Sequence, residues 1–387
     1  METTHRVVTG DARALETIED GSVELVVTSP PYPMIEMWDE LFAELDPAIG
    51  DALEAGDGRA AFDAMHAQLD RVWAEVDRAL VEGGIACINV GDATRTIDGT
   101  FRVYPNHARI LEAFDARGYD LLPDVLWRKP TNSAAKFMGS GMLPPNAYVT
   151  LEHEHILIVR KGGGRRSFEP GADRRYEAAY FWEERNRWFS DLWTDVRGEL
   201  QELPGSPDRE RSAAFPLEIP YRLCCMYSAY GDTVLDPFFG TGTTSLAALC
   251  AGRHSVGYEL DPGFVEHFDD RVDRAPALSS SVTKRRLRRH RSFVADRRAD
   301  GDSLAYQSVH YDVPVRTKQE RQIRFYAVDD VDVEDDGTAV TYRATHEPVG
   351  PVDAEIDADD SIDADDAGGS AGSTDRTDSE DAAGTGE

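Results

Sequence analysis

The sequence contains very little lysine, and its net charge is strongly negative. Only five of its 41 basic residues are lysines, whereas aspartate and glutamate together number 72, which gives a formal net charge of −31. An acidic, lysine-poor composition resembles that of proteins from halophiles that accumulate salt, whose surface charges are screened at molar salt, where the Debye length is about 3 Å. A biased base composition of the gene is the alternative explanation, because it also exchanges lysine for arginine.

Cysteine is scarce and long apolar runs do not occur. The four cysteines, Cys87, Cys224, Cys225 and Cys250, form no C-x-x-C pair and lie in apolar surroundings, so buried thiols are expected rather than disulfides or a zinc site. No apolar run reaches 18 residues, which argues against a transmembrane helix. The N-terminus lacks a basic segment followed by an apolar one, so we expect no signal peptide, no membrane partner and a cytoplasmic protein.

The length and the hydrophobic pattern predict one large α/β domain with an appendage. The chain has 387 residues, of which 41% are hydrophobic. Short apolar runs typical of buried parallel strands alternate with segments of helical periodicity. The expected strands cover residues 5–8, 23–27, 85–90, 119–127 and 156–159. The expected helices cover residues 12–18, 60–80 and 106–117, and the acidic stretch 34–58 is expected to form an irregular flap.

A glycine turn follows a short apolar strand in the second half of the chain. The turn runs from Asp236 to Thr244, contains Gly240 and Gly242, and precedes an apolar helix of small residues. Strand, glycine turn and helix open a nucleotide-binding βαβ unit, in which the backbone approaches the ligand and the helix N-terminus offers free N–H groups. Glu259 ends the next strand about twenty residues on, where a ribose-binding carboxylate belongs. The spacing is not G-x-G-x-x-G and no lysine follows, which excludes a Walker loop; a tight turn without a ligand remains the alternative.

A proline-rich loop directly follows the expected strand at residues 23–27. Its sequence is Ser29-Pro30-Pro31-Tyr32. Two prolines continue neither a helix nor a central strand, so they fix an extended loop beyond the carboxyl end of the strand, where open α/β sheets bind ligands. The loop presents the Ser29 hydroxyl and the carbonyls around Pro30 as fixed acceptors, and Tyr32 as a flat aromatic face. A stiff surface turn is the alternative.

With both motifs in place, the chain resembles the amino-group DNA methyltransferases that use S-adenosylmethionine. The catalytic motif of that family, [DNS]-P-P-[YFW], is matched by residues 29–32, and its cofactor motif is matched by residues 236–244. The catalytic motif comes first, which is the circularly permuted order of the beta group. Residues 211–220 match the segment before the cofactor strand, and Gly10-Asp11 matches the acid at the adenine end. The resemblance covers about residues 5–275 and implies a Rossmann-like α/β fold with a doubly wound, mostly parallel sheet.

The resemblance also implies which residues act in the reaction. It assigns Ser29, Pro30, Pro31 and Tyr32 to catalysis: Ser29 and the Pro30 carbonyl accept the N–H bonds of an exocyclic amine, and Tyr32 stacks on a flipped base. The cofactor residues that it implies are Asp11, Phe215, Pro216, Asp236, Pro237, Phe238, Gly240, Gly242, Thr243, Thr244 and Glu259. No metal is expected, because His153-Glu154-His155 lacks the H-E-x-x-H spacing and a third ligand.

The target base is left open between two amines. In the family, serine at the first motif position favours cytosine N4, whereas aspartate or asparagine favours adenine N6. Ser29 therefore favours N4, and the whole pattern resembles haloarchaeal enzymes that modify CTAG sites. Protein-glutamine or RNA methyltransferases carry a related loop, usually after the cofactor motif, and the order here disfavours them. A non-catalytic DNA-binding protein with the same fold is the alternative from another class.

Two basic stretches are candidates for contact with double-stranded DNA. Residues 162–210, rich in arginine and aromatic residues, are interpreted as an inserted target-recognition region, and residues 284–291 are the most basic run. The DNA-binding candidates are Lys129, Arg174, Arg175, Arg185, Arg187, Trp188, Arg285 and Arg286. A satellite aromatic core and a solvated helix face are the respective alternatives. The expected domains are a methyltransferase domain over residues 1–275, a basic segment with a small β-rich appendage over 276–350, and a disordered acidic tail over 351–387. A restriction endonuclease partner and a homodimer remain open.

Overall fold

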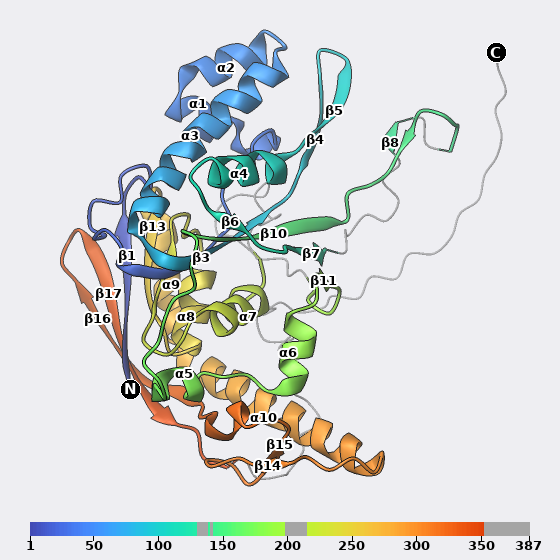
Figure 1. Cartoon of the computed structure of the whole chain (residues 1–387). Helices are drawn as coiled ribbons and strands as arrows, with labels where there is room; N and C mark the ends of the chain where they lie inside the picture. The colour runs from blue at the N-terminus through green and yellow to red at the C-terminus, as the bar shows by residue number, and fades with distance from the viewer. Residues whose placement is uncertain (130–137, 140–141, 198–214, 352–387) are drawn as a thin grey trace, which may run out of the picture.

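A single large sheet forms the centre of the protein (Figure 1). The computed structural model describes residues 1–129, 138–139, 142–197 and 215–351. Within these ranges, eleven strands join in the order β11-β7-β10-β3-β2-β12-β13-β1-β17-β16, and β6 pairs with β10. The strands are β1 (Glu2–Thr9), β2 (Val23–Thr28), β3 (Leu80–Val90), β6 (Asp120–Leu121), β7 (Val125–Arg128), β10 (His153–Arg160), β11 (Leu192–Trp193), β12 (Thr233–Asp236), β13 (His254–Glu259), β16 (Tyr326–Asp335) and β17 (Ala339–Pro348).

The five central strands are parallel, and the two strands that flank them, β10 and β17, run in the opposite direction. Strands β3, β2, β12, β13 and β1 pair in parallel in that order. Strand β10 is antiparallel to β3, and β17 is antiparallel to β1. The α/β class and the mostly parallel doubly wound sheet expected from the sequence are thereby confirmed.

Helices cover both faces of the sheet, because its central strands are apolar on both sides. Along β2, Leu25 and Val27 belong to one hydrophobic core, whereas Val26 between them belongs to the other. This alternation follows from the two-residue period of a strand. The helices that carry residues of the first core are α6 (Trp182–Trp188), α7 (Glu218–Tyr227), α8 (Thr243–Cys250), α9 (Pro262–Val272) and α10 (Ala275–Ala299); those of the second are α1 (Asp39–Leu45), α2 (Pro47–Glu54), α3 (Gly58–Ala79) and α4 (Asn106–Asp115).

The N-terminal third of the chain differs from the expectation in two places. Residues 12–18 form turns, not a helix. The stretch expected to be irregular contains η1 (Glu36–Trp38) followed by α1 and α2, and the two helices pack with α3 through Phe42 and Ile49. Asp46 caps α2 by accepting a hydrogen bond from Ala48 N, with Pro47 at the first helical position. This cap and the buried Phe42 and Ile49 explain why an acidic segment folds into helices.

The β-rich segment near the C-terminus is not a separate appendage. Strand β17 pairs with β1 along seven residues, and β16 extends the same sheet beyond it. Figure 1 shows this red hairpin beside the N-terminal strand. The C-terminal tail, expected to be disordered, lies outside the described residues from 352 onward.

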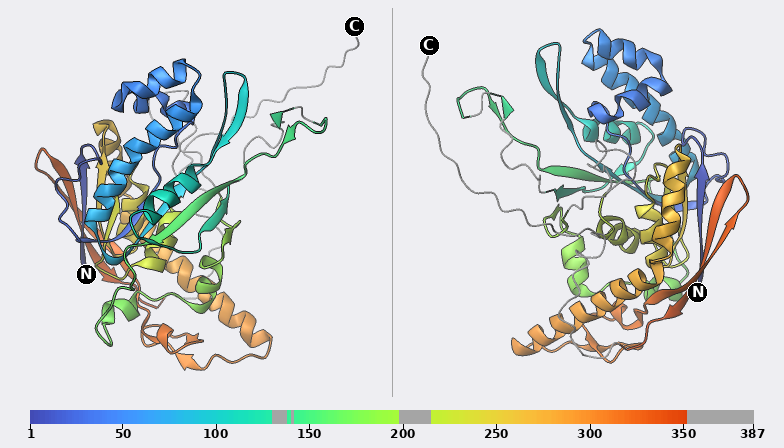
Figure 2. Two further views of the ribbon diagram at one scale, coloured as in Figure 1. Left: turned by 45° about the horizontal axis from the view of Figure 1, so that its top comes forward. Right: turned by 180° about the vertical axis from the view of Figure 1, so that it is seen from behind.

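Smaller elements project from this body. The hairpin β4 (Ala93–Ile97) and β5 (Thr100–Tyr104) and the pair β8 (Met138–Gly139) and β9 (Ala147–Tyr148) extend away from the sheet in both views of Figure 2. The rings of Phe101 and Tyr148 stack with centroids 4.7 Å apart. The short helix α5 (Asp173–Glu177), the pair β14 (Tyr306–Gln307) and β15 (Pro314–Val315), and η3 (Gln319–Gln322) lie towards α10 (Figure 1). Among the described residues, the helices are all too short or too polar to span a bilayer.

Candidate active site

The loops that follow the central strands meet at the carboxyl-terminal edge of the sheet, where these parallel strands end. Because β1, β13, β12 and β2 are parallel neighbours, their carboxyl ends bring together Asp11, Glu259, the glycine loop at 236–244 and the proline loop at 29–32. Strand β10 is antiparallel, so its beginning, with Glu154, lies at the same edge. Lys129 follows β7, which is in turn antiparallel to β10. The edge therefore collects groups from six strands.

The proline loop and the glycine loop are joined by direct hydrogen bonds. Thr28 Oγ1 donates to Asp236 Oδ1 at 2.7 Å, and Thr244 Oγ1 donates to the carbonyl of Val27 at 3.2 Å. Strands β2 and β12 also pair directly, with Leu25 opposite Val234. Two segments more than 200 residues apart in the sequence thus form one continuous surface.

The glycine loop is shaped by two glycines with a left-handed backbone. Gly242 has a φ of 77°, and a Cβ there would lie 2.3 Å from Phe268 Cδ2. Gly240 has a φ of 51°, but the nearest atom to a Cβ there is Phe238 O at 3.9 Å, so this part of the loop faces open space. The left-handed backbone requires glycine at both positions, and only Gly240 leaves room for a close approach from outside.

Two carboxylates next to the glycine loop have raised pKa values. Burial raises the pKa of Asp236 to about 6, although Thr28 and Thr244 bonds oppose the shift. Burial also raises the pKa of Glu259, against hydrogen bonds from the backbone of Asp261 and Gly240. Glu259 Oε2 accepts from Gly240 N at 2.7 Å, so the carboxylate lies against the loop where a cofactor ribose was expected. The role predicted for Glu259 remains a prediction.

The proline loop ends in a buried polar network centred on Tyr32. Ser29 Oγ lies 3.0 Å from the Tyr32 hydroxyl, which donates to Glu154 Oε2 at 3.1 Å. Asn89 Nδ2 donates both to the Tyr32 hydroxyl at 2.9 Å and to Glu154 Oε2 at 2.7 Å. Lys129 Nζ donates to Glu154 Oε1 at 2.9 Å. Tyr32 is only 8% exposed, and its ring lies against Gly91, so the freely presented aromatic face expected from the sequence is largely covered here.

The loop that follows is held in place by Asn106, the first residue of α4. Asn106 Nδ2 donates to the carbonyls of Pro33 and Gly91, at 3.1 and 3.0 Å. Met34 has a φ of 69°, an uncommon backbone conformation for a residue other than glycine. Its side chain is buried and its N–H faces Met65 Sδ. Buried contacts thus hold the end of the proline loop in a strained conformation.

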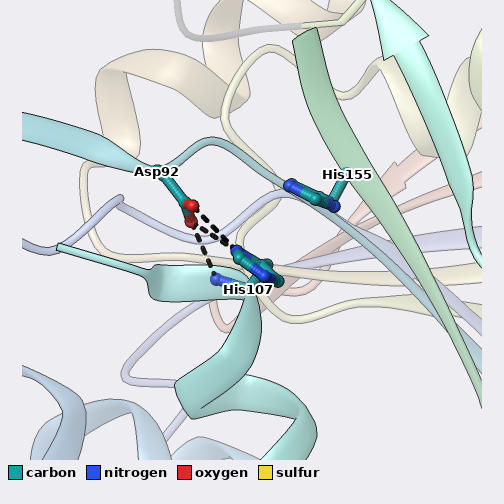
Figure 3. A group of neighbouring side chains, drawn as sticks. All are labelled: Asp92, His107 and His155. Carbon is teal, nitrogen blue, oxygen red and sulfur yellow. Dashed lines mark hydrogen bonds and ion pairs between the residues drawn. The ribbon is translucent and has the colours of Figure 1, made fainter. Parts of the chain in front are cut away.

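Asp92, His107 and His155 form a polar cluster beside this network (Figure 3). Both oxygens of Asp92 lie 2.8 Å from His107 Nδ1, a hydrogen-bond distance. The bond with Asp92 raises the pKa of His107, whereas burial lowers that of His155. The two imidazoles stack, with centroids 4.1 Å apart and planes inclined by 10°. Imidazole lone pairs lie in the ring plane, so two parallel rings do not converge on one ion, and the geometry is that of an ion pair stacked on a second ring.

The remaining cofactor candidates lie on the same elements. Asp11 follows β1 but is bound by Arg13, with Nη2 to Oδ2 at 2.6 Å. Phe215 and Pro216 are buried just before α7, and Phe215 shares a hydrophobic core with Phe239 of the glycine loop. Pro237, Phe238, Thr243 and Thr244 belong to the loop itself or to the start of α8. The structure brings these residues together, while their contact with a ligand remains a prediction.

Several of the DNA-binding candidates prove to be structural. Trp188 is 1% exposed, and Arg286 is buried with Nε and Nη2 donating to Glu184 at 2.6 and 2.7 Å, so the prediction that they contact DNA is wrong for this conformation. Arg174 binds the buried carboxylate of Asp232 at 2.6 Å, although its own side chain is exposed. Trp188 and Arg286 occupy inward-facing positions of α6 and α10, which their place in arginine-rich runs concealed.

The other DNA-binding candidates keep different degrees of exposure. Arg175 and Arg185 are exposed and stack on the rings of Phe168 and Phe189. Arg187 and Arg285 are partly buried, beside Asp195 at 3.7 Å and Glu218 at 2.8 Å. Lys129 belongs to the network around Tyr32. The part of the expected recognition region from residue 198 onward lies outside the described residues.

The sequence motifs did not identify three residues of the site as functional candidates. Asn89 lies in the apolar strand β3, Glu154 lies in a His-Glu-His run that suggested a metal, and Asn106 begins α4. Each is buried and polar, with its partners on other elements. A polar residue within a buried strand is the signal that would have marked Asn89 and Glu154, because such groups need partners.

Comparison with known proteins agrees with this geometry. A family model described as DNA methylase, covering N6 and N4 enzymes, matches residues 23–270. The type II methyltransferase M.MthZI of Methanothermobacter thermautotrophicus is 50% identical over 329 residues, which are 84% of this chain and 91% of that protein. M.MjaI, a type II methyltransferase of Methanocaldococcus jannaschii, is 50% identical over 283 residues, 70% of this chain and 92% of that protein.

A solved structure supports the same relationship. TTHA0409 from Thermus thermophilus, crystallised in complex with S-adenosyl-L-methionine, is 35% identical, with a TM-score of 0.55 over 70% of this chain and 93% of that one. The match of fold, the proline and glycine loops joined at one sheet edge, and the family model over most of the chain all agree. The chain therefore belongs to the N6/N4 DNA methylase family.

Proposed function

We propose that this protein transfers a methyl group from S-adenosyl-L-methionine to the N4 amino group of cytosine in a short duplex DNA site, as the methyltransferase of a type II restriction-modification system. The observation that carries the proposal is the direct junction between the Ser29-Pro30-Pro31-Tyr32 loop and the glycine loop, through Thr28 and Asp236. In this proposal, the junction lets Ser29 accept a hydrogen bond from the target amine beside a loop suited to a nucleoside cofactor.

The residues present fit the cofactor that the related structure contains. Gly240 leaves open space beside its backbone, and the N-terminus of α8 begins at Gly242. Asp236 and Glu259 stand on the two neighbouring strands, at the ends where a nucleoside binds in such sheets. When bound, the cofactor supplies an electrophilic methyl group on a sulfonium.

The protein's contribution to the reaction is to position and polarise the amine. The nitrogen of an exocyclic amine is a weak nucleophile, because its lone pair is delocalised into the ring. Hydrogen bonds from its N–H groups to Ser29 Oγ and the Pro30 carbonyl hold it towards tetrahedral geometry and aim the lone pair at the methyl group. Fixed acceptors of this kind act by orientation and electrostatics.

The choice of base rests on the first position of the proline motif, and the choice of site rests on the family resemblance. Serine at this position favours cytosine N4 in the family, and the resemblance to CTAG-modifying enzymes suggests CTAG as the target. Adenine N6 is the competing product, because the same acceptors suit either amine. Exposed Arg175 and Arg185 are the recognition-region candidates for phosphate contacts.

The test is chemical analysis of DNA from a host that expresses the protein. Nucleoside mass spectrometry and methylation-aware sequencing are expected to show N4-methylcytosine within CTAG for the wild type and a strong loss for Ser29→Ala. N6-methyladenine would replace the base assignment by its alternative, and methylation outside CTAG would refute the proposed site. Absence of methylation together with absence of cofactor binding by calorimetry would favour a non-catalytic DNA-binding protein.

A further inference from the structure

The hydrogens in the network around Tyr32 can be placed by counting. The tyrosine hydroxyl has one hydrogen, which it donates to Glu154 Oε2, because a carboxylate oxygen only accepts. The same hydroxyl oxygen accepts from Asn89 Nδ2, which is a donor. The contact with Ser29 Oγ at 3.0 Å must therefore use the serine hydrogen, so Ser29 donates to Tyr32. Ser29 then has no hydrogen left to direct towards a substrate, and its lone pairs are available to accept.

The network thus forms a directed chain, in which Ser29 donates to Tyr32 and Tyr32 donates to Glu154. Its members are shielded from water: Tyr32 is 8% exposed, Glu154 is 9% and Asn89 is 2%. Burial and the nearby Glu154 charge raise the pKa of Tyr32 well above its usual value, so the tyrosine stays protonated and remains a donor. Lys129 and Asn89 hold the two oxygens of Glu154, which stabilises the carboxylate as the end point of the chain.

We infer that Glu154 is the terminal proton acceptor of the methylation reaction, reached from the target amine through Ser29 and Tyr32. The inference rests on the proposed function but applies equally to cytosine N4 and adenine N6. It requires that Ser29 Oγ receives an N–H of the amine, as argued above. It assigns a chemical role to a residue that lies outside the proline and glycine motifs.

The reaction demands such an acceptor. As the amine nitrogen forms the new N–C bond, the C–S bond breaks with its electron pair remaining on sulfur, and the methylated nitrogen carries one positive charge. The nitrogen then loses one proton to Ser29 Oγ, the serine hydroxyl proton passes to the Tyr32 oxygen, and the tyrosine proton passes to Glu154 Oε2. Serine and tyrosine end neutral, as they began, and Glu154 ends as a carboxylic acid whose proton returns to water on product release.

The chain is tested by single-turnover methylation of a duplex substrate with Glu154→Gln, Tyr32→Phe and the double variant. Glutamine keeps the size of Glu154 but has no carboxylate, and phenylalanine keeps the buried ring but removes the hydroxyl. Each single variant is expected to slow the reaction by about 10²-fold or more, the range of general base catalysis. The double variant is expected to be no slower than the slower single variant, because both changes interrupt one chain. Multiplied losses would overturn the inference.

Further measurements separate a proton acceptor from a merely structural group. The wild-type rate is expected to rise with pH and then level off, with a solvent deuterium effect, whereas Glu154→Gln is expected to lose this pH limb. Calorimetric cofactor affinity and the melting temperature are measured for every variant. Glu152→Gln is the matched control: Glu152 lies two residues earlier, is exposed, and pairs with Arg128 at 3.1 Å outside the chain.

The outcomes distinguish this inference from the proposed function. If the wild type methylates DNA and Glu154→Gln reacts at the same rate, Glu154 is not the acceptor. If Glu154→Gln does not fold, Tyr32→Phe alone decides, since a wild-type rate and pH profile for that variant would also refute the chain. If the wild type itself methylates neither base, the proposed function fails instead.

Discussion

At the residue scale, Arg286 shows how a basic run can serve the interior of a protein. Its guanidinium donates to both oxygens of Glu184 and lies 4.4 Å from the centroid of the Phe325 ring. Burial by itself lowers the pKa of Arg286, but the charge and hydrogen bonds of Glu184, together with Tyr221 and Cys225, raise it well above the usual value. The pair joins α10 to α6, so this arginine fixes the position of two helices.

Replacing Arg286 is therefore expected to affect stability and not DNA recognition. Arg286→Ala leaves Glu184 as an uncompensated buried charge, which costs about 3–5 kcal/mol of the free energy of unfolding. Urea unfolding measures the loss. Arg185→Ala, at an exposed position on α6, is expected to change stability by less than about 0.5 kcal/mol and to weaken DNA binding. If Arg286→Ala instead weakened DNA binding without a loss of stability, while Arg185→Ala lost stability, Arg286 would be a DNA contact.

The site residues differ in how far the sequence could predict them. Ser29 and the glycines were recognisable because a loop of fixed conformation requires particular residue types at adjacent positions. Asn89 lies in β3, Glu154 lies in β10 and Lys129 directly follows β7, so their meeting depends on β10 running antiparallel to both β3 and β7. Strand direction at the sheet edge is a property of the whole topology, which no local pattern contains.

At the scale of elements, the glycine loop connects local backbone conformation with ligand binding. Gly242 caps α8 in a left-handed conformation, with Phe239 and Phe268 closing the space where a side chain would be. Gly257, on the neighbouring β13, is equally closed, since a Cβ there would lie 2.1 Å from Phe239 Cδ2. Phe239 and Phe268 therefore fill the space on the core side of the loop and fix its path.

A methyl group at Gly242 is expected to disturb both stability and cofactor binding. Gly242→Ala forces a left-handed alanine, at about 1–2 kcal/mol, and displaces the packed rings, at about 1–3 kcal/mol more. Calorimetry is expected to show at least a tenfold loss of affinity for S-adenosyl-L-methionine, and urea unfolding the loss of stability. Gly163→Ala is the control, because its Cβ would meet open space and its φ is not left-handed. Unchanged cofactor affinity in Gly242→Ala would contradict the assignment of the loop.

The elements themselves were predicted unevenly. The helix at 60–80 and the central strands were correct to within a few residues at most ends, because amphipathic period and buried apolar runs act locally. The β-rich character of the segment 276–350 was expected, but its membership of the main sheet depends on pairing with residues 2–8 at the other end of the chain. Helices α1 and α2 were missed because their charged surface dominates the composition, while their packing depends on two buried residues, Phe42 and Ile49.

At the scale of the whole molecule, a seam of buried histidines joins the two ends of the described chain. Strand β1 lies between β13 and β17, and Thr3 Oγ1 contacts both His5 Nε2 at 2.9 Å and His346 Nε2 at 2.8 Å. His5 Nδ1 lies 2.9 Å from Ser255 Oγ on the other side. The N-terminal amino group also donates to the carbonyl of His346. The seam therefore holds the N-terminal strand, and with it Asp11, to the C-terminal hairpin.

The histidines of this seam are neutral in the folded protein. Burial, reinforced by His346 and His254, lowers the pKa of His5 to about 3. Burial and the nearby N-terminus lower that of His346 to about 4. In the unfolded chain both titrate near 6.5. Their contribution to stability is complete above pH 6.5 and is lost as the pH falls, by about 1.4 kcal/mol per pH unit for each histidine.

Removing one histidine isolates its share of this pH dependence. The whole protein also contains groups of opposite sign, such as Asp236, whose raised pKa of about 6 lets the folded state gain relative stability as the pH falls below 6. His5→Gln leaves those groups in place, so the difference in free energy of unfolding between wild type and variant is the informative quantity.

We expect His5→Gln to be less stable than wild type at pH 7.5, because the contacts of His5 with Thr3 and Ser255 change. The difference is expected to shrink by about 1.4 kcal/mol per pH unit between pH 6.5 and 4.5, as measured by urea unfolding at constant salt. A difference independent of pH would mean that His5 is not kept neutral by burial, and that the seam is open to water in solution.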